Sequence, residues 1–362
     1  MQRLQERGVP ISEHDVTQRG PSTPDWEAIH LFLEVVRQGS FRSASDHLGQ
    51  SINALRRRIT ELEQQLGVTL LTRHVDGVRT TAEGAEILDA ARKMELASFG
   101  LIRARDRSAP NLAGEVRLAV TEGLGTFWLA PRLIEFQRRH PKLLVDLNCA
   151  MQSADVLRLQ ADAAIQLTKP ENPDVKLVKL GRLHSMPFAA PSYIETYGAP
   201  KTLEELFQHR VVLQIAEQTA MQEIYDRVAP GVPQVGFVAM RNNVSSAHIW
   251  AISKGAGIGW APTYVHAIGG RMVPLELDLR FAFDIWLTYH TDAARIPRVR
   301  RMIDWVIDSF DSRKFPWFRD EFVHPNDLPN EYDGAPIINL FEGFCGAKRP
   351  AAPARSSPIQ ER

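Results

Sequence analysis

The spacing of apolar residues near the N-terminus predicts short helices in succession. Between Asp25 and Gly39, apolar residues recur at three- and four-residue steps, which is typical of an amphipathic helix. These residues are Ile29, Phe32, Leu33 and Val36. Ser40 is suited to cap a second helix over residues 41–48, and Gly49 is suited to end it.

A third helix and a β-hairpin complete this region. We expect the helix to begin after Ser51 and to stop at Gly67, with a buried stripe along one side. The stripe consists of Leu55, Ile59, Leu62 and Leu66. Residues 68–80 alternate apolar and polar positions around the turn-forming pair Asp76-Gly77, which predicts a two-stranded wing. Two helices joined by a tight turn and followed by a wing are typical of DNA-binding domains.

A longer helical pattern follows over residues 81–107. Three apolar residues lie seven positions apart, namely Ile87, Met94 and Leu101. This spacing favours pairing with a second copy of the helix, and the alternative is a helix packed on its own domain. Pro110, Asn111 and Gly114 break the pattern and predict a linker.

Beyond the linker, residues 115–312 alternate between strand-like and helix-like segments. Strands are expected at 115–120, 143–150, 162–167, 187–194, 211–215, 236–240, 257–262 and 285–290. Helices are expected at 127–139, 154–160, 202–208, 247–254 and 299–310, with a further helical segment around Gln222. This alternation predicts a parallel sheet with helices on both faces, in a region long enough for two small lobes.

The two ends of the chain differ from the middle. Residues 1–24 lack helical or strand periodicity and are predicted to be a disordered leader. The C-terminal extension, 313–362, is rich in aromatic residues and proline, and its last residues, 351–362, have the composition of a disordered tail. We expect its aromatic side chains to pack onto the body of the protein. These are Phe315, Trp317, Phe318 and Phe322.

Composition narrows the class of protein. Apolar residues make up 44% of the chain and charged residues 24%, and the 43 basic and 43 acidic residues cancel, so any nucleic-acid binding must come from a local patch. Two cysteines, Cys149 and Cys345, exclude a disulfide framework and a four-cysteine zinc site. We expect no metal and no cofactor. With no signal-peptide core and no membrane-length apolar run, a cytoplasmic location is expected.

The exposed side of the third helix carries the chemistry of DNA recognition. Ile52, Asn53, Arg56, Arg57 and Thr60 lie opposite the apolar stripe. An arginine can bind guanine through two hydrogen bonds or hold a phosphate, and Asn53 could read adenine. The alternative interpretation is a solvated charged face balanced by Glu61 and Glu63.

The N-terminal region resembles the winged helix-turn-helix of LysR-type transcriptional regulators. The resemblance rests on WEAIHLFLEVVRQGSFRSASDHL at 26–48, ALRRRITELEQQLGVTLLTR at 54–73 and TTAEG at 80–84. It extends more weakly through RLAVTEG at 117–123 and GAGIGWAP at 255–262, and covers about residues 25–312.

This resemblance implies a fold and a function. The implied fold is a mixed α+β and α/β chain: a winged helix-turn-helix at 25–80, a dimerisation helix at 81–107 and a two-lobed α/β effector domain at 115–312, similar to periplasmic binding proteins. The implied protein is a homodimer or homotetramer that binds double-stranded operator DNA, responds to a small-molecule effector and has no catalytic activity. The implied DNA contacts are Ser40, Arg42, Ser51, Ile52, Asn53, Arg56, Arg57 and Arg73.

The match is not uniform along the recognition helix. Ser51, Arg57 and Arg73 agree with the family pattern, whereas Ile52 and Asn53 depart from it. The family commonly has glutamine where this chain has Ile52, so an apolar contact replaces an amide that would read adenine. Arg56 and Arg58 are further departures. The operator sequence of relatives therefore cannot be assumed for this chain.

The implied effector site lies at the carboxyl ends of strands, where the two lobes meet. The candidate residues are Thr121, Glu122, Gly125, Gln166, Thr168, Gln214 and Asn243, of which Asn243 is expected to begin a helix. Such a site in the family often holds a carboxylate with hydroxyl and backbone N–H groups. Glu122 would repel an acidic ligand unless it points away, so a neutral or cationic effector stays open.

Two other hypotheses remain at this point. The chain could be an α/β small-molecule-binding protein or enzyme whose N-terminal helices only mediate association. It could also be a regulator whose effector pocket is filled or covered, for example by the C-terminal extension. The segment GAGIG at 255–259 lacks the spacing of a dinucleotide-binding loop and supports no cofactor.

Overall fold

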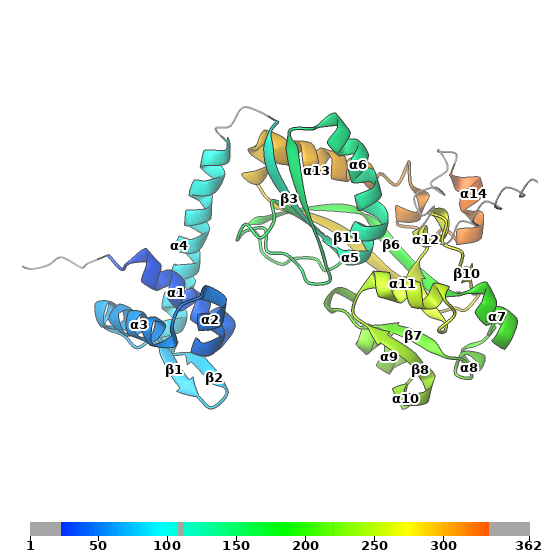
Figure 1. Ribbon diagram of the computed structural model, residues 1–362, viewed down its shortest axis with the longest axis horizontal. Helices are drawn as coiled ribbons and strands as arrows, with labels where there is room; N and C mark the ends of the chain where they lie inside the picture. Colours follow the sequence, from blue (N-terminus) through cyan, green and yellow to red (C-terminus); the bar gives the residue numbers. More distant parts are fainter. Residues whose placement is uncertain (1–22, 108–111, 220, 333–362) are drawn as a thin grey trace, which may run out of the picture. The chain divides into compact units, whose positions relative to one another are not determined.

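The computed structural model describes residues 23–107, 112–219 and 221–332. The chain forms two compact units, 1–98 and 99–362, and each is described here by itself (Figure 1). The expected leader falls almost wholly outside the described residues, as do most of the linker, Cys345 and the tail. No helix in the described part of the chain is both long enough and apolar enough to cross a membrane.

The N-terminal unit contains the three expected helices. These are α1 Trp26–Gln38, α2 Phe41–Leu48 and α3 Ile52–Leu66. Their apolar faces meet in one core, in which Phe32, Leu55 and Leu62 are completely buried. Because the stripe on α3 repeats every three to four residues, burying it leaves the opposite side of the helix in solvent.

Polar side chains fix where these helices begin. The side chains of Asp25, Ser40 and Ser51 accept hydrogen bonds from N–H groups in the first turns of α1, α2 and α3, as their positions in the sequence predict. Gly49 ends α2 with a φ of 64°, a left-handed conformation that glycine adopts without a steric penalty. This tight turn sets α3 at an angle to α2, and the predicted helix-turn-helix is confirmed.

The predicted wing is present as β1 Leu71–His74 and β2 Gly77–Thr80, which pair antiparallel. It is fastened to the helices by a hydrogen bond from the Val78 N–H to the Gly39 carbonyl, 2.8 Å long. A Cβ atom at Gly77 would lie 2.3 Å from that same carbonyl oxygen. Only glycine allows the wing to approach the α1–α2 corner this closely.

The long helix α4 spans Ala82–Arg107. Ile87, Leu88 and Ala91 on its first turns pack against the core of the N-terminal unit. Further along, Met94 and Leu101 are exposed, with Leu101 75% accessible. The alternative of a helix packed on its own domain therefore describes the beginning of α4. No described residue buries Met94 or Leu101 further along the helix.

The C-terminal unit is built on a seven-stranded sheet in the order β10-β6-β11-β5-β3-β4, with β9 also paired to β6. The strands are β3 Gly114–Thr121, β4 Leu143–Ala150, β5 Ala163–Gln166, β6 Val175–Ala189, β9 Gly259–Pro262, β10 Val273–Pro274 and β11 Phe281–His290. A separate pair, β7 Val211–Gln214 and β8 Val238–Asn242, is parallel.

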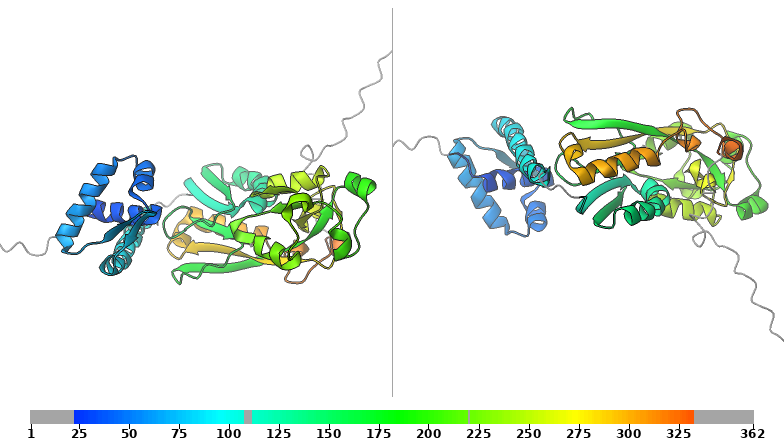
Figure 2. Two further views of the ribbon diagram at one scale, coloured as in Figure 1. Left: turned by 90° about the horizontal axis from the view of Figure 1, so that it is seen from below. Right: turned by 90° about the horizontal axis from the view of Figure 1, so that it is seen from above.

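The helices of this unit connect and cover the strands. They are α5 Glu122–Leu124, the π-helical turn η1 Gly125–Leu129, α6 Ala130–Arg139, α7 Pro191–Tyr197, α8 Leu203–Leu206, the 3-10 turn η2 Glu217–Thr219, α9 Met221–Val228, α10 Gln234–Phe237, α11 Ser245–Ser253, α12 Tyr264–Ala267, the 3-10 turn η3 Ala293–Arg295 and α13 Pro297–Ser309. Figures 1 and 2 show α6 and α13 side by side over the sheet, where the rings of Phe136 and Trp305 are 5.1 Å apart.

The prediction of a parallel sheet is only partly correct. In the seven-stranded sheet, the described pairings of β3 with β4 and β5 are parallel, but those of β6 and β11 are antiparallel. The difference arises at β6: lysine and arginine interrupt the apolar residues of its first half without strict alternation, so the sequence predicts a strand only at its end, 187–189. Residues 191–194 begin α7 instead, and residues 154–160, predicted as a helix, form turns.

Two lobes follow from the path of β6 and β11. The first lobe contains β3, β4, β5, α6 and α13, and the second contains residues 191–274; the long strands run through both. The register of their pairing shifts between Ile285 and Trp286: Ile285 pairs with Gly181 and Trp286 with Lys179, so one residue of β6 is left over. This β-bulge marks the passage from one lobe to the other.

The described part of the C-terminal extension packs onto this body, as predicted. It contains the 3-10 turns η4 Pro316–Phe318 and η5 Pro325–Asp327 and the helix α14 Leu328–Glu331. Trp317 and Phe318 are at most 1% exposed and meet the ring of Trp128 edge-on, with centroids 5.5 and 5.0 Å apart. The extension therefore belongs to the main core of this unit.

Candidate functional site

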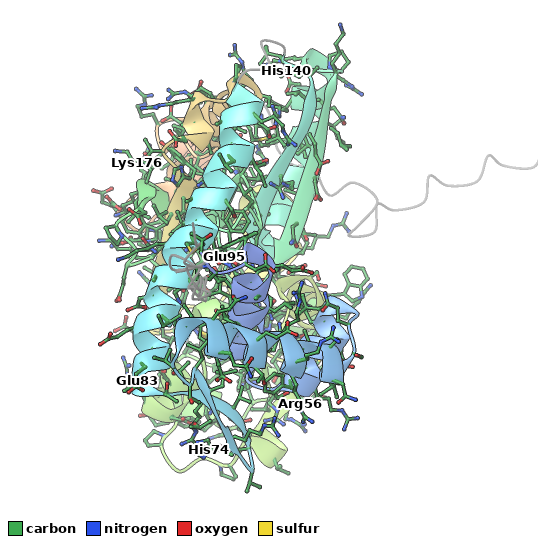
Figure 3. All side chains as sticks on the ribbon, turned by 90° about the vertical axis from the view of Figure 1, so that its left-hand side faces the viewer. Arg56, His74, Glu83, Glu95, His140 and Lys176 are labelled. Atoms are coloured by element: carbon green, nitrogen blue, oxygen red, sulfur yellow. The ribbon has the colours of Figure 1, made fainter. Side chains whose placement is uncertain are left out.

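The outer side of α3 carries three consecutive arginines with different environments. Arg56 and Arg57 are exposed, and Figure 3 shows the side chains of α3 and of the wing, with Arg56 and His74 labelled, pointing outwards from the N-terminal unit. Within the described ranges, no carboxylate lies within ion-pair distance of Arg42, Arg56 or Arg73. These three cations are available to an external anion.

The ring of Phe41 draws two of these arginines together. The guanidinium carbons of Arg56 and Arg73 lie 5.7 and 6.0 Å from the centroid of that ring. Because Phe41 begins α2, Arg56 lies on α3 and Arg73 on β1, three separate elements converge at this point. The result is a local positive patch on a chain whose total charge is zero.

Arg58 contrasts with its neighbours. Its Nη2 atom lies 2.7 Å from Oε2 of Glu27 and 3.7 Å from Oδ2 of Asp25, both at the start of α1. Arg57 has a longer contact of 3.6 Å with Glu61, in which both side chains are largely exposed. The alternative interpretation of a balanced charged face thus fits Arg58 and does not fit Arg56.

The remaining predicted DNA contacts lie at helix starts. Ser40 and Ser51 are N-caps whose hydroxyls accept from Ser43 N at 3.0 Å and from Ala54 N at 3.2 Å. Asn53 is exposed in the first turn of α3, while Ile52 is half-buried against the core. The roles of these residues on DNA remain predictions.

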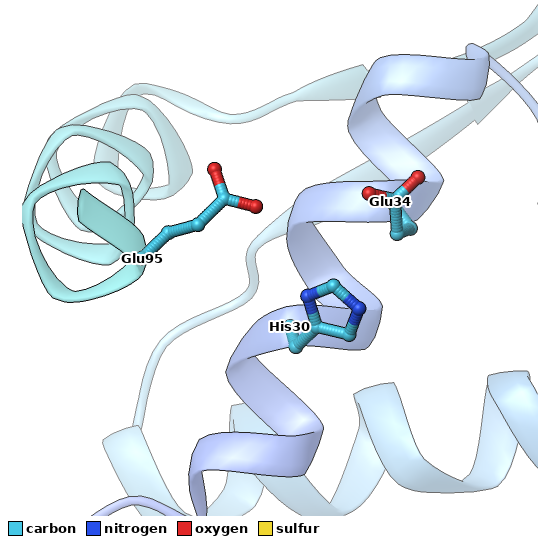
Figure 4. Close-up of side chains that lie close together, drawn as sticks. All are labelled: His30, Glu34 and Glu95. Atoms are coloured by element: carbon cyan, nitrogen blue, oxygen red, sulfur yellow. The ribbon is translucent and has the colours of Figure 1, made fainter. Parts of the chain in front are cut away.

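A buried polar cluster joins α1 to α4 in the same unit. Glu34 and Glu95 are 5% and 3% exposed, and the guanidinium of Arg37 contacts both carboxylates. The potential ligand atoms of His30, Glu34 and Glu95 lie within 4.8 Å of one another. Figure 4 shows His30 and Glu34 on α1 and Glu95 on α4. Arg37 already supplies a positive charge to both carboxylates, which gives the cluster a structural role in holding α4 against α1.

The C-terminal unit has a pocket where its lobes meet, with a cavity volume of about 60 Å³. Side chains from the first lobe, the second lobe and the crossing strands all contribute. Apolar groups predominate: Leu124, Met151, Leu167, Leu183, Val212, Met221, Ile249, Trp260, Pro262 and Phe283. Polar groups are Thr121, Gln214, Thr219, Ser185, Ser245, His248 and Tyr264. The described extension contributes nothing to this lining.

The predicted effector residues are only partly gathered here. Thr121 and Gln214 line the pocket. Gln166 and Thr168 line a separate hollow on the first lobe, and Gly125 packs against Cys149. Asn243 is exposed and does not begin a helix, since α11 starts at Ser245 with Val244 as its N-cap.

One side chain of the second lobe bridges two strand ends of the first. The Oε1 atom of Gln218, in η2, accepts hydrogen bonds from the Thr121 hydroxyl and from the Leu167 N–H, both 2.9 Å long. The N–H donor of Leu167 fixes the amide orientation, because only the oxygen of Gln218 can accept. Gln218 is 5% exposed and shields these donors from solvent.

Glu122 forms a second bridge between the lobes. Its Oε2 accepts from the Ser246 N–H at the start of α11, 3.0 Å away, and its Oε1 accepts from the Thr126 hydroxyl at 3.1 Å. A negative charge at a helix N-terminus satisfies free N–H groups and the helix dipole. The carboxylate thus points toward α11 and is 8% exposed.

The titratable groups on the pocket wall are neutral near pH 7. Burial lowers the pKa of His248 to about 4, although the Trp260 carbonyl partly opposes this shift. Burial, followed by the nearby charge of Glu122, raises the pKa of Tyr264, whose hydroxyl donates to the Gly123 carbonyl at 3.2 Å. Burial likewise raises the pKa of the Cys149 thiol, which disfavours a reactive thiolate.

Sequence reasoning missed several residues of this pocket. Ser245 in the lining, and Gln218 directly behind Thr121, lie at element ends whose position depends on how the second lobe folds back, and no local pattern marks them. His248 sits inside a mainly apolar helix and resembled an ordinary core residue. Knowledge of how β6 pairs with β9 and β11 would have placed these residues, but no pattern in the sequence indicates that pairing.

Comparison with known families identifies both units. Residues 26–85 match the pattern described as "Bacterial regulatory helix-turn-helix protein, lysR family", and residues 109–311 match the "LysR substrate binding domain". The second match alone covers more than half of the chain. The chain belongs to the LysR family.

Individual relatives are similar to parts of the chain. An HTH-type transcriptional regulator of Xanthomonas campestris pv. campestris (strain 8004) is 34% identical over 194 residues, covering 52% of this chain and 55% of that protein. The uncharacterized regulator YhjC of Escherichia coli (strain K12) is 29% identical over 185 residues, covering 51% of this chain and 62% of that protein. The chain therefore spans little more than half the length of these two relatives.

A solved structure also matches most of this chain. The full-length Vibrio cholerae virulence activator AphB is 19% identical, with a TM-score of 0.47, over 78% of this chain and 99% of that chain. The predicted combination of a winged helix-turn-helix, a long helix and a two-lobed α/β domain is confirmed by the family matches and by the fold described above.

Proposed function

We propose that this protein is a sequence-specific DNA-binding transcriptional regulator controlled by a small molecule held between the lobes of its C-terminal unit. The observation that carries the proposal is the convergence of Arg56 and Arg73 on Phe41. Two exposed guanidinium groups from the recognition helix and the wing suit the phosphates and base edges of a major groove. Such a regulator acts where the chromosome lies, in the bacterial cytoplasm.

The pocket is proposed to bind its ligand rather than convert it. Both ring nitrogens of His248 have partners within the protein, Asn242 and the Trp260 carbonyl, and the Tyr264 hydroxyl is bonded to Gly123. A general acid or base needs a group that can exchange a proton with the substrate, and neither side chain is placed to do so. This supports a regulator over the alternative of an α/β enzyme.

The regulator is proposed to work as a homodimer or a higher homo-oligomer through α4. Met94, Leu101 and Ile102 are 42%, 75% and 41% exposed on this helix. Apolar residues at heptad-like spacing are stabilised when a second helix covers them. A dimer would also present two recognition helices to two half-sites of an operator.

The first experiment compares two neighbouring arginines. DNA from the upstream region of the protein's own gene is titrated with the full chain over a series of salt concentrations. Arg56→Ala should weaken specific binding by about 10- to 100-fold, and the salt slope should fall by about 1 if Arg56 contacts a phosphate.

Arg58→Ala is the matched control, since Arg58 is paired with Glu27. It should leave both affinity and salt slope near the wild-type values. Equal losses from the two substitutions would contradict the assignment of the positive patch. A wild-type protein without salt-dependent DNA affinity would overturn the proposed function itself.

A further inference from the structure

The pocket between the lobes is uncharged, which bears on the ligand that the proposed function requires. Among the residues that the structure describes, its lining contains no Asp, Glu, Lys or Arg side chain. His248 and Tyr264 are the titratable side chains of this lining, and burial favours the neutral form of both. An ionic ligand placed here would lose its hydration without gaining an opposite charge.

The helix start that could bind an anion is already occupied. The first turn of α11 faces the first lobe, and its N-cap residue Val244 provides no side-chain acceptor. Glu122 provides that acceptor from across the lobe boundary, 3.0 Å from the Ser246 N–H. The close fit is visible in the backbone, because a Cβ atom at Gly123 would lie 2.8 Å from the Ser245 side chain. An external carboxylate would have to displace Glu122 and meet its charge.

The donors at the strand ends are occupied as well. The Thr121 hydroxyl at the end of β3 and the Leu167 N–H after β5 both point to one acceptor, the Oε1 atom of Gln218. Two donors converging on one oxygen form the kind of site that would otherwise hold an oxygen of a carboxylate ligand. In this chain a neutral amide holds that position.

We infer that this pocket selects an uncharged, largely apolar small molecule, and that Glu122 and Gln218 exclude carboxylate ligands by occupying the two places where one would bind. The inference rests on the proposed function in so far as it calls the ligand an effector. The preference for an uncharged ligand follows from the pocket residues alone. The ligand packs against Leu183, Trp260 and Phe283. Its single polar group meets Gln214 and Ser245, whose side chains are 3.1 Å apart.

The test uses three probes of the same shape and different charge: benzamide, benzoate and benzamidinium. Binding to the full chain is measured by isothermal titration and by thermal shift. Benzamide should bind at least about 10-fold more tightly than either ion, because only the ions lose hydration without a partner. Tighter binding of benzoate or benzamidinium, or binding of none of the three, overturns the inference.

Substitution of Glu122 tests the mechanism of exclusion. Glu122→Ala vacates the start of α11, so acetate should raise its melting temperature saturably, while acetamide should not. Glu217→Ala, at an exposed position of η2, is the control and should show no acetate effect beyond that of wild type. A Glu122→Ala protein that acetate does not stabilise overturns the assignment of Glu122.

Glu122→Gln covers the case in which the alanine variant fails to fold. It preserves the shape of the side chain and removes its charge, so the preference for benzamide over benzoate should shrink by about 10-fold. An unchanged preference overturns the inference. DNA affinity is measured on the same protein samples: its absence beside a clear benzamide preference refutes the proposed function alone, and the reverse result refutes the pocket assignment alone.

Discussion

The outer face of α3 and the pocket between the lobes differ in the physical means by which we propose that they recognise their partners. On α3, Arg56 and Arg57 are exposed and stand near few acidic groups. Beside the pocket, the Glu122 carboxylate is turned toward the start of α11, and the described lining residues include no Asp, Glu, Lys or Arg. The outer face of α3 would attract a polyanion through long-range electrostatic attraction. The pocket would select a neutral molecule through the complementarity of its shape.

This difference explains how a chain with zero net charge can serve both tasks. Charge is effective on an exposed surface that meets a ligand of high charge density, where salt dependence is the signature. Inside a pocket, an unpartnered charge costs more than it contributes, so the charges there are paired within the protein. The predictions below test whether the two regions are independent and whether each depends on its charge state.

The largest effect is expected from Trp317→Ala in the C-terminal extension. Trp317 is 1% exposed, and removing its indole should lower the free energy of unfolding by about 3–5 kcal/mol. The core of the N-terminal unit is a separate cluster, so only the C-terminal unit should lose stability. Hydrogen exchange measured by mass spectrometry should therefore show lost protection in β3 and retained protection in α3.

Trp250→Ala is the control for that experiment, because Trp250 is 46% exposed. It should cost about 1 kcal/mol or less. Equal deprotection of α3 and β3 in Trp317→Ala would show that the two regions do not fold independently.

An intermediate effect is expected from pH, through His248. Its pKa is about 4 in the folded protein, and an unfolded histidine has a pKa of about 6.5. Between these values the unfolded state binds more protons, so stability is complete above about pH 6.5 and falls as the pH falls toward 4. From pH 7 to pH 5 the loss through His248 should be about 2 kcal/mol.

Urea unfolding of wild type and His248→Gln at both pH values isolates this contribution. Other buried histidines, such as His184, also have a lowered pKa and shift both proteins in the same direction. The difference between the two pH dependences should equal the His248 contribution. Parallel curves would mean that His248 does not titrate as its burial predicts.

The smallest effect is expected from Ser51, which tests the DNA-facing region. Ser51→Ala removes the N-cap of α3 and should lower the free energy of unfolding by about 1 kcal/mol. Ser51→Asp keeps the cap, so stability should be preserved, while its negative charge should weaken DNA binding. Urea unfolding and DNA titration of both variants provide the measurements. If Ser51→Asp bound DNA as wild type does, Ser51 would lie away from the phosphates.

The sequence predicted the N-terminal unit well because its signals are local. Asp25, Ser40 and Ser51 are caps in the structure, and the apolar stripe on α3 is buried as its spacing indicates. Helix boundaries depend on residues within one turn, so a single sequence contains the information.

The pocket could not be predicted to the same degree. Thr121 and Gln214, both named from the sequence, line the pocket, but Gln218 is near Thr121 only because two lobes meet across 97 residues of chain. The antiparallel strand β6, interrupted by charged residues, determines that meeting and has no clear alternating pattern. Non-local pairing of this kind leaves no trace in short windows of sequence.

The bulge between β6 and β11 has a mechanical consequence. Gly181 lies at the bulge, and a Cβ atom there would be 2.4 Å from the Phe318 carbonyl oxygen of the C-terminal extension. A rotation of one lobe against the other must twist these strands where the extension rests on them. Because Trp317 and Phe318 are part of the main core, such a rotation would be transmitted to the extension. The rate of limited proteolysis after about residue 313 would then report lobe motion.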